Sequence, residues 1–379
     1  MPSPQHPADE PAPALDLSAD PAQLTAALID VESVSDHETR LADLVEDALR
    51  GLDHLSVHRD GDAIVARTEL GRPERVVLAG HLDTVPLPSI DGARGTVPSS
   101  WTGSDDDGDL TLWGRGATDM KGGVAVQLGL AAQLTRPARD ITYVFYDHEE
   151  VDSAASGLGR LERSVPELLE ADFAVLLEPT DGTVEGGCNG TLRFVIAPQG
   201  LAAHSGRAWR GDNAIHKLAD VLAVLAEHEP ATIEVEGLEY REGLNAIRIG
   251  GGTAGNVIPD AASIEINYRF APDKSLEEAQ QRCRDLFPGH ELEFVDLSAA
   301  ARPGLDRAAA ADFVAAVGQE PKPKYGWTDV ARFSAMGVPA VNFGPGDALL
   351  AHTDDEHVSA AAIRECRRVL LSWLSQDIA

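Results

Sequence analysis

Cysteine is scarce in this chain, which has three cysteines in 379 residues and no CxxC pair. A sparse, odd set of cysteines argues against a disulfide framework and indicates a reducing compartment. Long apolar runs are missing as well, since no stretch approaches the roughly 18 residues of a membrane-spanning helix. The first 13 residues are rich in proline and polar side chains, so they predict a disordered tail and not a signal peptide. These absences together indicate a cytoplasmic protein.

Basic residues are few relative to acidic ones: 31 Lys and Arg stand against 62 Asp and Glu, for a formal net charge of −31. Nucleic acids and anionic membranes bind basic surfaces, so we expect neither of them as a partner. The acidic excess favours a soluble protein and suits a site that holds cations.

Short apolar runs that end in polar, glycine-rich sequence recur at residues 76–80, 141–145, 173–177 and 338–343. They alternate with segments of helical periodicity at about 22–50, 122–135, 308–318 and 359–375. Strands alternating with helices predict an α/β fold, with a mainly parallel mixed sheet flanked by helices. Ligands of such sheets bind outside the carboxyl ends of the strands, where the polar residues of this chain lie.

The middle of the chain has a different pattern. Residues 191–200, 245–250 and 262–270 alternate with a two-residue period, and a helix fits residues near 212–228. This pattern predicts a second domain of the α+β class with a half-exposed antiparallel sheet. The pattern alone does not decide whether this domain is inserted into the first or follows it.

The run 76–80 is followed by His81 and Asp83. Residues two apart on an extended segment point to one side, so His81 can bind a metal while Asp83 orients its ring. The alternative is an ordinary strand-end turn that contains polar residues.

Asp119 lies between glycines, in the stretch WGRGATDMKGG at 113–123. The glycines allow the backbone to approach a ligand closely. Asp119 can also be the N-cap of the helix that follows. A phosphate-binding loop is excluded, because the GxxxxGK[ST] order is missing.

The stretch YDHEEVD at 146–152 places Glu149 and Glu150 at the end of an apolar run. Two carboxylates at one site can have different roles: one binds a cation and the other takes a proton from water. Glu178 follows a further run, and His352 follows a Gly-Pro-Gly loop. Each of these residues alone can equally be a solvated surface group.

Together the strand ends offer two histidines, one aspartate and two glutamates as ligands. This donor set suits zinc, cobalt or manganese better than calcium or an iron–sulfur cluster. Five ligands are one more than a tetrahedral zinc needs, and two metals that share a carboxylate would account for the surplus.

The chain resembles the co-catalytic zinc peptidases and deacylases over roughly residues 20–375. The motifs that carry this resemblance are GHLDTVP (80–86), GRGATDMKGG (114–123), EE (149–150), EP (178–179), AAHSGR (202–207), NVIPD (256–260) and AHTDDE (351–356). The resemblance implies two divalent metals, with zinc favoured and cobalt or manganese as alternatives. It also implies a homodimer that acts on a small N-acylated amino acid.

The resemblance assigns a role to each residue of the site. His81, Asp119 and Glu178 would bind one metal, and Asp119, Glu150 and His352 the other, with Asp119 bridging. Glu149 would be the general base and later the general acid, and Asp83 would orient His81. His204 would polarise the oxyanion, as a residue of the partner subunit. The implied substrate contacts are Asn256, Arg269, Arg207 and Thr328.

The resemblance also implies how the chain is divided. Residues 14–182 and 297–379 would form the catalytic, metal-binding domain. Residues 183–296 would be an inserted α+β domain that acts as a lid and as the dimerisation domain.

Within this family the resemblance is greatest to the succinyl-diaminopimelate desuccinylases, through YDHEEV (146–151), GCNGTLR (187–193) and AHSGRAWRGDNAIHKL (203–218). It implies hydrolysis of N-succinyl-LL-2,6-diaminopimelate to succinate and LL-2,6-diaminopimelate, in lysine and diaminopimelate biosynthesis. The alternatives are an acetylornithine deacetylase, a broad N-acyl-amino-acid deacylase or carboxypeptidase, and a catalytically inactive protein that binds metal or a small acid. One departure from the family pattern is His148, where many members have aspartate.

Overall fold

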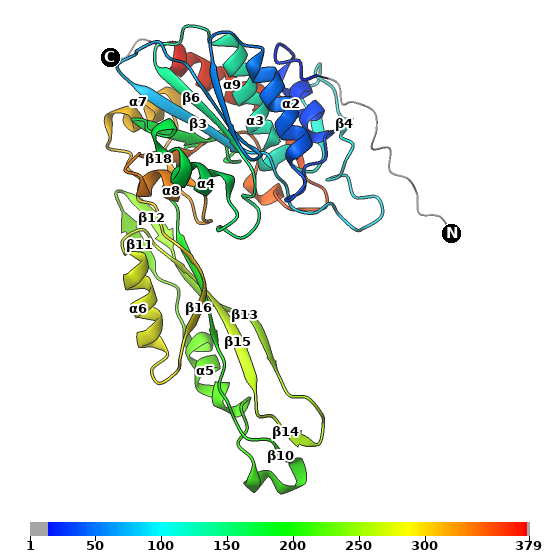
Figure 1. Cartoon of the computed structure of the whole chain (residues 1–379), viewed down its shortest axis with the longest axis vertical. Coiled ribbons are helices and arrows are strands. Elements are labelled where there is room, and N and C mark those ends of the chain that lie inside the picture. Colours follow the sequence, from blue (N-terminus) through cyan, green and yellow to red (C-terminus); the bar gives the residue numbers. More distant parts are fainter. Residues whose placement is uncertain (1–13, 377–379) are drawn as a thin grey trace. The chain divides into compact units, whose positions relative to one another are not determined.

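The computed structural model describes residues 14–376 of the chain. The predicted disordered tail, residues 1–13, lies outside the described residues. The described chain forms two compact units, and many of their helices and strands are labelled in Figure 1. Unit 1 contains residues 14–184, 308–320 and 341–376, and unit 2 contains Glu185–Arg307 and Pro321–Ala340.

The limits of unit 2 differ from the predicted domain limits of 183 and 296. Strand β16 (Glu293–Ser298) continues past residue 296 within unit 2. Strand β17 (Lys322–Pro323) pairs in parallel with β8 (Glu185–Gly186), and the segment 321–340 belongs to unit 2 as well. A two-residue strand leaves no periodic signal in a sequence, so this second segment could not be recognised there.

The sheet of unit 1 has its strands in the order β1, β2, β6, β3, β7 and β18. Their bounds are β1 (Ser56–Asp60), β2 (Ala63–Arg67), β3 (Arg75–His81), β6 (Asp140–Tyr146), β7 (Phe173–Leu176) and β18 (Ala340–Asn342). β3 lies between β6 and β7 and is parallel to both, whereas β2 is antiparallel to β6 and to β1. This mixed, mainly parallel sheet flanked by helices confirms the predicted α/β fold class.

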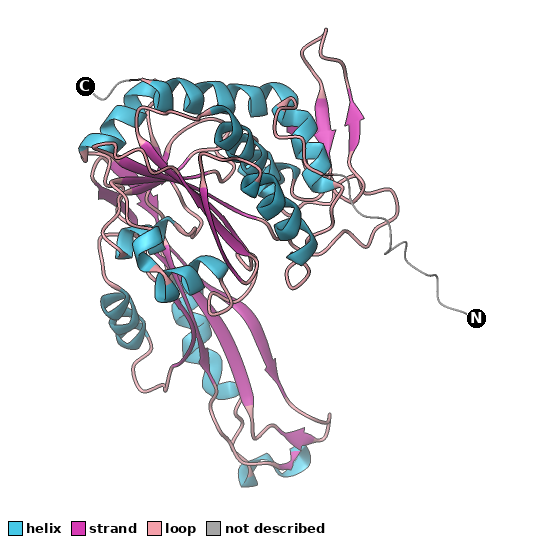
Figure 2. Ribbon diagram, turned by 45° about the horizontal axis from the view of Figure 1, so that its top comes forward, coloured by secondary structure: helices cyan, strands magenta, loops and turns pink. Residues whose placement is uncertain are grey.

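The helices of unit 1 are α1 (Pro21–Ile29), α2 (Thr39–Arg50), α3 (Gly122–Gln133), α4 (Gly157–Ser164), α7 (Ala308–Val317) and α9 (Ala360–Ser375). α3 is apolar on almost every side and is buried among α1, α9 and β3. Nε2 of Gln127 on α3 donates to the carbonyls of Leu78 in β3 and Val144 in β6, at 2.9 and 3.0 Å. Figure 2 shows these helices against the strands of the sheet.

The helical periodicity of residues 22–50 belongs to two helices, not one. α1 ends at Ile29 and α2 begins at Thr39, and the segment between them runs along the end of β3. The hydroxyl of Ser33 donates to the carbonyl of Leu82, and the N–H of Ser35 donates to the carbonyl of Thr84. The break therefore places a polar loop beside the carboxyl end of β3.

A small antiparallel sheet in unit 1 contains β4 (Ser100–Thr102), β5 (Thr111–Trp113) and β19 (His357–Ser359). Short helical turns lie at Ala117–Lys121, Pro166–Leu168 and Ala348–Leu350. No helix among residues 14–376 is long and apolar enough to cross a membrane.

Unit 2 contains an antiparallel sheet with the strand order β13, β15, β9 and β16. Three strands of this sheet are β9 (Gly190–Ile196), β13 (Gly243–Gly251) and β15 (Ala262–Phe270). The other elements of unit 2 are β10 (Ala203–His204), β11 (Thr232–Val235), β12 (Leu238–Arg241), β14 (Val257–Ile258), α5 (Ala219–Glu227), α6 (Leu276–Leu286), α8 (Val330–Ala335) and the turns Ser205–Arg210 and His216–Leu218.

The core of unit 2 lies between one face of this sheet and the helices α5 and α6. Ile264 and Ile266 on β15 are buried together with Val221 on α5 and Cys283 on α6. Alternate residues of β15 are buried, and those between them are partly or fully exposed. The structure confirms the predicted α+β unit with a half-exposed antiparallel sheet.

Candidate functional site

The carboxyl ends of three neighbouring strands carry candidate ligands in unit 1. His81 is the last residue of β3, Glu149 and Glu150 follow β6, and Glu178 lies two residues beyond β7. Because β3 is parallel to β6 and to β7, these strand ends meet at one edge of the sheet.

Asp119 reaches this edge from the loop before α3. Its two carboxylate oxygens face different histidines: Oδ1 is 3.1 Å from Nε2 of His81, and Oδ2 is 3.1 Å from Nε2 of His352. Lys121, and not Asp119, is the N-cap residue of α3. Asp119 therefore does not cap α3.

The loop that carries Asp119 is held by Glu356, which is buried. Its Oε1 accepts the N–H groups of Thr118 and Asp119 at 3.0 and 3.1 Å, and its Oε2 accepts the N–H of Gly116 at 2.9 Å. Oε2 also pairs with the guanidinium of Arg115 at 2.9 Å. A single carboxylate therefore fixes the backbone on both sides of the turn before Asp119.

Two groups of side chains in this site can each hold a metal ion. The first contains His81, Asp119 and Glu178, and the second contains Asp119, Glu150 and His352, with ligand atoms within 4.8 Å of one another in each group. Both groups share Asp119, whose two oxygens point to the two groups' histidines. Mixed histidine and carboxylate donors around a shared carboxylate fit a pair of divalent cations.

Glu149 lies at the border of this centre. Ligand atoms of His81, Glu149 and Glu150 also lie within 4.8 Å of one another. Asp83 holds both glutamates through their backbone, since Oδ1 accepts the N–H of Glu149 at 3.0 Å and Oδ2 accepts that of Glu150 at 3.1 Å. Nδ1 of His81 lies 2.9 Å from the carbonyl of Asp83 and 3.6 Å from its carboxylate.

The carboxylates make the site strongly attractive to cations. Hydrogen bonds to Asp119 and Glu150 raise the pKa of His352 to about 10. Burial alone would lower the pKa of His81, but Asp119 raises it well above its ordinary value. Burial raises the pKa of Glu150, and the negative charge of the neighbouring Asp119 raises it further. Cations that occupy the site would relieve this repulsion among the carboxylates.

The remaining predicted residues belong to unit 2. His204 and Asn256 lie on neighbouring segments, because the carbonyl of Asn256 accepts the N–H of Ser205 at 2.9 Å, and both are exposed. Arg207 is exposed in the following turn. Arg269 is half-buried on β15, opposite Thr191 of β9.

Thr328, also in unit 2, is buried near the start of α8. Its carbonyl lies 3.8 Å from Sγ of Cys188, which is buried too. Cys188 is in none of the candidate metal groups found among the described residues.

Three contributors to the site were not assigned a role from the sequence. They are Glu356, Ser35, whose hydroxyl donates to Oδ2 of Asp83 at 2.8 Å, and Lys121. Nζ of the buried Lys121 donates to the carbonyls of Leu28 and Val31, and burial lowers its pKa to about 7. Glu356 lies inside the motif AHTDDE, so the sequence shows the residue. The sequence does not show that its carboxylate accepts hydrogen bonds from the backbone of the Asp119 loop.

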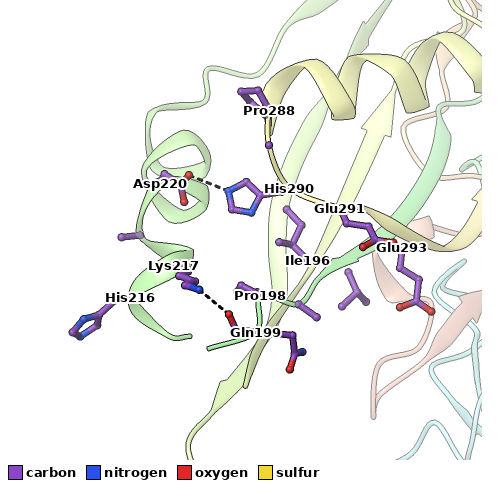
Figure 3. A pocket seen from close by; sticks show the side chains of 14 residues that line it. Ile196, Pro198, Gln199, His216, Lys217, Asp220, Pro288, His290, Glu291 and Glu293 are labelled. Atoms are coloured by element: carbon purple, nitrogen blue, oxygen red, sulfur yellow. Dashed lines mark hydrogen bonds and ion pairs between the residues drawn. The ribbon is translucent and has the colours of Figure 1, made fainter. Parts of the chain in front are cut away.

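Unit 2 contains a separate hollow of about 1020 Å³, shown in Figure 3. Two of its polar side chains have partners within the hollow: Nε2 of His290 is 2.9 Å from Asp220, and Nζ of Lys217 donates to the backbone carbonyl of Gln199 at 2.8 Å. None of the predicted site residues lines this hollow. The candidate site is therefore the cluster in unit 1.

Comparisons with known proteins relate the chain to metallopeptidases. The sequence model described as Peptidase family M20/M25/M40 matches residues 77–376. The chain is 52% identical over 363 residues to the "Putative succinyl-diaminopimelate desuccinylase DapE" of Mycobacterium tuberculosis (strain CDC 1551 / Oshkosh), covering 95% of this chain and 99% of that one. It is 42% identical over 375 residues to the "Succinyl-diaminopimelate desuccinylase" of Corynebacterium glutamicum, covering 96% and 98%.

Solved structures share the fold. The YXEP protein of Bacillus subtilis, described as a dinuclear metal-binding peptidase of the M20 family, matches with a TM-score of 0.68 and 16% identity over 95% of this chain and 98% of that one. The family match spans the strand ends, the Asp119 loop and the His352 loop. The chain belongs to peptidase family M20/M25/M40.

Proposed function

We propose that this chain is a metal-dependent amidohydrolase that cleaves N-succinyl-LL-2,6-diaminopimelate to succinate and LL-2,6-diaminopimelate. The observation that carries this proposal is the identity of 52% and 42%, over almost the whole chain, to two relatives described as desuccinylases of this substrate. The clustering of the candidate ligands in unit 1 supports the same chemistry. Acetylornithine deacetylase and broad N-acyl-amino-acid deacylase activity are the alternatives.

Two divalent cations, zinc in the first place and cobalt or manganese as alternatives, are proposed to bind at the two ligand groups. His81, Asp119 and Glu178 would hold one, and Asp119, Glu150 and His352 the other. Bound cations of this kind supply Lewis acidity and lower the pKa of water. The shared position of Asp119 between the two histidines supports this assignment.

Glu149 is proposed to move the proton. Its carboxylate accepts a proton from the attacking water and later donates it to the nitrogen of the leaving amine, which balances the hydrolysis of the amide. Asp83 keeps Glu149 in place through the backbone N–H of that residue. Because Glu150 is held by the other oxygen of Asp83, the proton carrier and the metal ligand are fixed by one side chain.

Unit 2 is proposed to supply the remaining groups. His204 of the partner subunit would stabilise the oxyanion, a contribution of a few kcal/mol for one such donor. Asn256, Arg207, Arg269 and Thr328 would contact the substrate. The guanidinium groups suit the several carboxylates of N-succinyl-diaminopimelate, because arginine binds carboxylates in a bidentate manner.

Unit 2 also offers a surface on which a homodimer can form. β13 is the edge strand of its sheet, and its Ile247 and Ile249 are 52% and 54% exposed. Ile215 and Leu222, before and within α5, are 41% and 42% exposed. An exposed edge strand with apolar side chains is a template for pairing with a second copy.

The dimer is tested by light scattering coupled to size-exclusion chromatography. Ile249→Asp on β13 should convert the dimer into a monomer, because it buries a charge in the proposed interface. Val295→Asp is the matched control, since Val295 is 47% exposed on β16 at the opposite edge of the same sheet. A wild-type monomer, or a dimer that survives Ile249→Asp, contradicts the proposed interface.

Steady-state turnover of N-succinyl-LL-2,6-diaminopimelate and of N-acetylornithine by the zinc-loaded protein tests the proposed function. We expect kcat/KM for the succinyl substrate to exceed that for the acetyl substrate by at least about 100-fold, since binding the extra carboxylate contributes to the transition state. A higher kcat/KM for N-acetylornithine selects the alternative deacetylase. Absence of turnover of both substrates contradicts the proposed function.

A further inference from the structure

His148, the residue that departs from the family pattern, lies in an unusual backbone conformation. Its φ is 59°, in the left-handed region that residues with a side chain rarely occupy. This turn comes directly after β6 and precedes Glu149 and Glu150. It brings the N–H groups of both glutamates to the carboxylate of Asp83, at 3.0 and 3.1 Å.

The ring of His148 joins two segments that are far apart in the sequence. Nδ1 lies 2.8 Å from Oδ2 of Asp147, at the end of β6, and 3.3 Å from Oε1 of Glu38. Nε2 lies 3.0 Å from Oδ1 of Asp36. The backbone N–H of His148 also donates to Oε1 of Glu38 at 3.3 Å. The ring thus connects the strand end to the loop between α1 and α2.

The same loop contacts Asp83 from its other end. The hydroxyl of Ser35 donates to Oδ2 of Asp83 at 2.8 Å, and the N–H of Ser35 donates to the carbonyl of Thr84 at 3.1 Å. The contacts therefore form a closed circuit, from Asp83 through Ser35 and the loop to His148, and back to Asp83 through Glu149. Displacing the loop would therefore shift the turn that precedes Glu149.

The charges around the ring make it hard to replace. Glu38 and Asp147 are almost fully buried, at 1% and 2% exposure, and Glu38 lies close enough to Asp83 for their charges to repel. Asp147 has a second partner in Arg160, at 2.8 Å. Without the imidazole, the buried Glu38 would lose its ion-pair partner and keep its repulsion from Asp83, so the loop would be pushed away from the strand end.

We propose that His148 is a positioning residue for Glu149, which ties the loop at 35–38 to the end of β6 and thereby aims the carboxylate of the proton carrier. This inference rests on the proposed function, since it takes Glu149 as the group that moves the proton. His148 belongs to neither of the two candidate metal groups, and it acts through the backbone turn and Asp83.

A double-mutant cycle on the zinc-loaded full-length protein tests the proposal. His148→Gly removes the ring but permits the left-handed backbone conformation. The variant therefore measures the effect of losing the ring while the backbone turn is kept. We expect kcat to fall by about 10- to 100-fold, a loss typical of a misplaced catalytic group, while KM and the zinc content stay unchanged. In the background of Glu149→Gln, the same substitution should change the residual rate by less than about threefold, because the residue it positions is already inactive.

His148→Asn tests whether a side chain with an N–H donor restores the activity. It also shows whether a folding defect explains the loss in His148→Gly. Asparagine tolerates the left-handed conformation, and its amide N–H group can replace Nδ1. It should restore most of the kcat that His148→Gly loses, at a similar melting temperature. Any of three results overturns the proposal. The first is a wild-type kcat in His148→Gly, and the second is an equal loss of kcat in the wild-type and Glu149→Gln backgrounds. The third is a loss of zinc that parallels the loss of kcat. An inactive wild type instead contradicts the proposed function.

Discussion

The carboxylate of Asp83 and the backbone N–H of Glu149 form a hydrogen bond of 3.0 Å. The other oxygen of the same carboxylate accepts the N–H of Glu150 at 3.1 Å and the hydroxyl of Ser35 at 2.8 Å. Asp83 was expected to orient the ring of His81, but the shorter contact of that ring is with the carbonyl of Asp83. The carboxylate of Asp83 thus organises the turn that carries the two adjacent glutamates.

Asp83→Asn should therefore weaken both metal binding and catalysis. An amide has one acceptor oxygen, so its NH₂ group would face an N–H of the turn that now donates to a carboxylate oxygen. We expect metal affinity to fall by about 10- to 100-fold and kcat at saturating metal to fall by a similar factor. Metal titration followed by steady-state kinetics measures both, and a variant with unchanged metal affinity and kcat contradicts this role.

Glu149→Gln and Glu150→Gln should separate the proton carrier from the metal ligand, because the two residues are neighbours with similar burial. Glu149→Gln should retain both metals and lose about 100- to 10,000-fold in kcat, as expected for a missing general base. Glu150→Gln should lose metal at the group that contains His352. Metal analysis of the dialysed proteins serves as the control, and substantial turnover by metal-loaded Glu149→Gln rules out the assigned base.

Most residues of the candidate site could be found in the sequence because they follow recognisable strands. His81, Glu149, Glu150 and Glu178 come directly after apolar runs, and parallel strands bring such ends together. The residues that hold this candidate site in place were harder to find. Glu356 contacts the backbone of a loop about 240 residues earlier, and hydrogen bonds to the backbone leave no mark on the sequence of their partners.

The loop between α1 and α2 is a second place where tertiary hydrogen bonds could not be predicted from the sequence. Residues 22–50 have one apolar periodicity, but Ser33, Ser35 and Glu38 leave the helix to contact β3 and the turn after β6. Their partners lie roughly 50 to 110 residues away in the chain. Tertiary hydrogen bonds override the helical pattern at this point, and the pattern alone cannot indicate where they form.

Chelation should abolish activity and also lower the melting temperature. The carboxylate of Asp119 lies close to those of Glu150 and Glu178, and cations that neutralise these groups stabilise the folded protein by mass action. We expect turnover to disappear after treatment with a chelator and to return on addition of zinc or cobalt. Calorimetry with and without metal measures the change in melting temperature. Full activity of a protein verified to be metal-free contradicts the assigned mechanism.

Asp140 should make the stability of unit 1 depend on pH. This residue begins β6 and accepts the N–H groups of Leu70 and Arg72 and the hydroxyl of Thr68, each at 2.8 Å. Burial alone would raise its pKa, but these hydrogen bonds lower the pKa of Asp140 below its ordinary value. A carboxyl group whose pKa is lower in the folded state stabilises the fold above its unfolded pKa of about 3.9, and this stabilisation is lost as the pH falls through the folded pKa.

Asp140→Asn should accordingly lower the free energy of unfolding by about 1–3 kcal/mol near pH 7, the cost of losing hydrogen bonds to a buried charged acceptor. The difference from the wild type should narrow as the pH falls below about 4, because the wild-type carboxylate then takes up a proton. Urea unfolding of both proteins between pH 7 and pH 3, with chelator present throughout, measures the difference without a contribution from metal release. A difference of the same size at every pH contradicts the prediction, since it would show that the charge of Asp140 adds nothing to its hydrogen bonds.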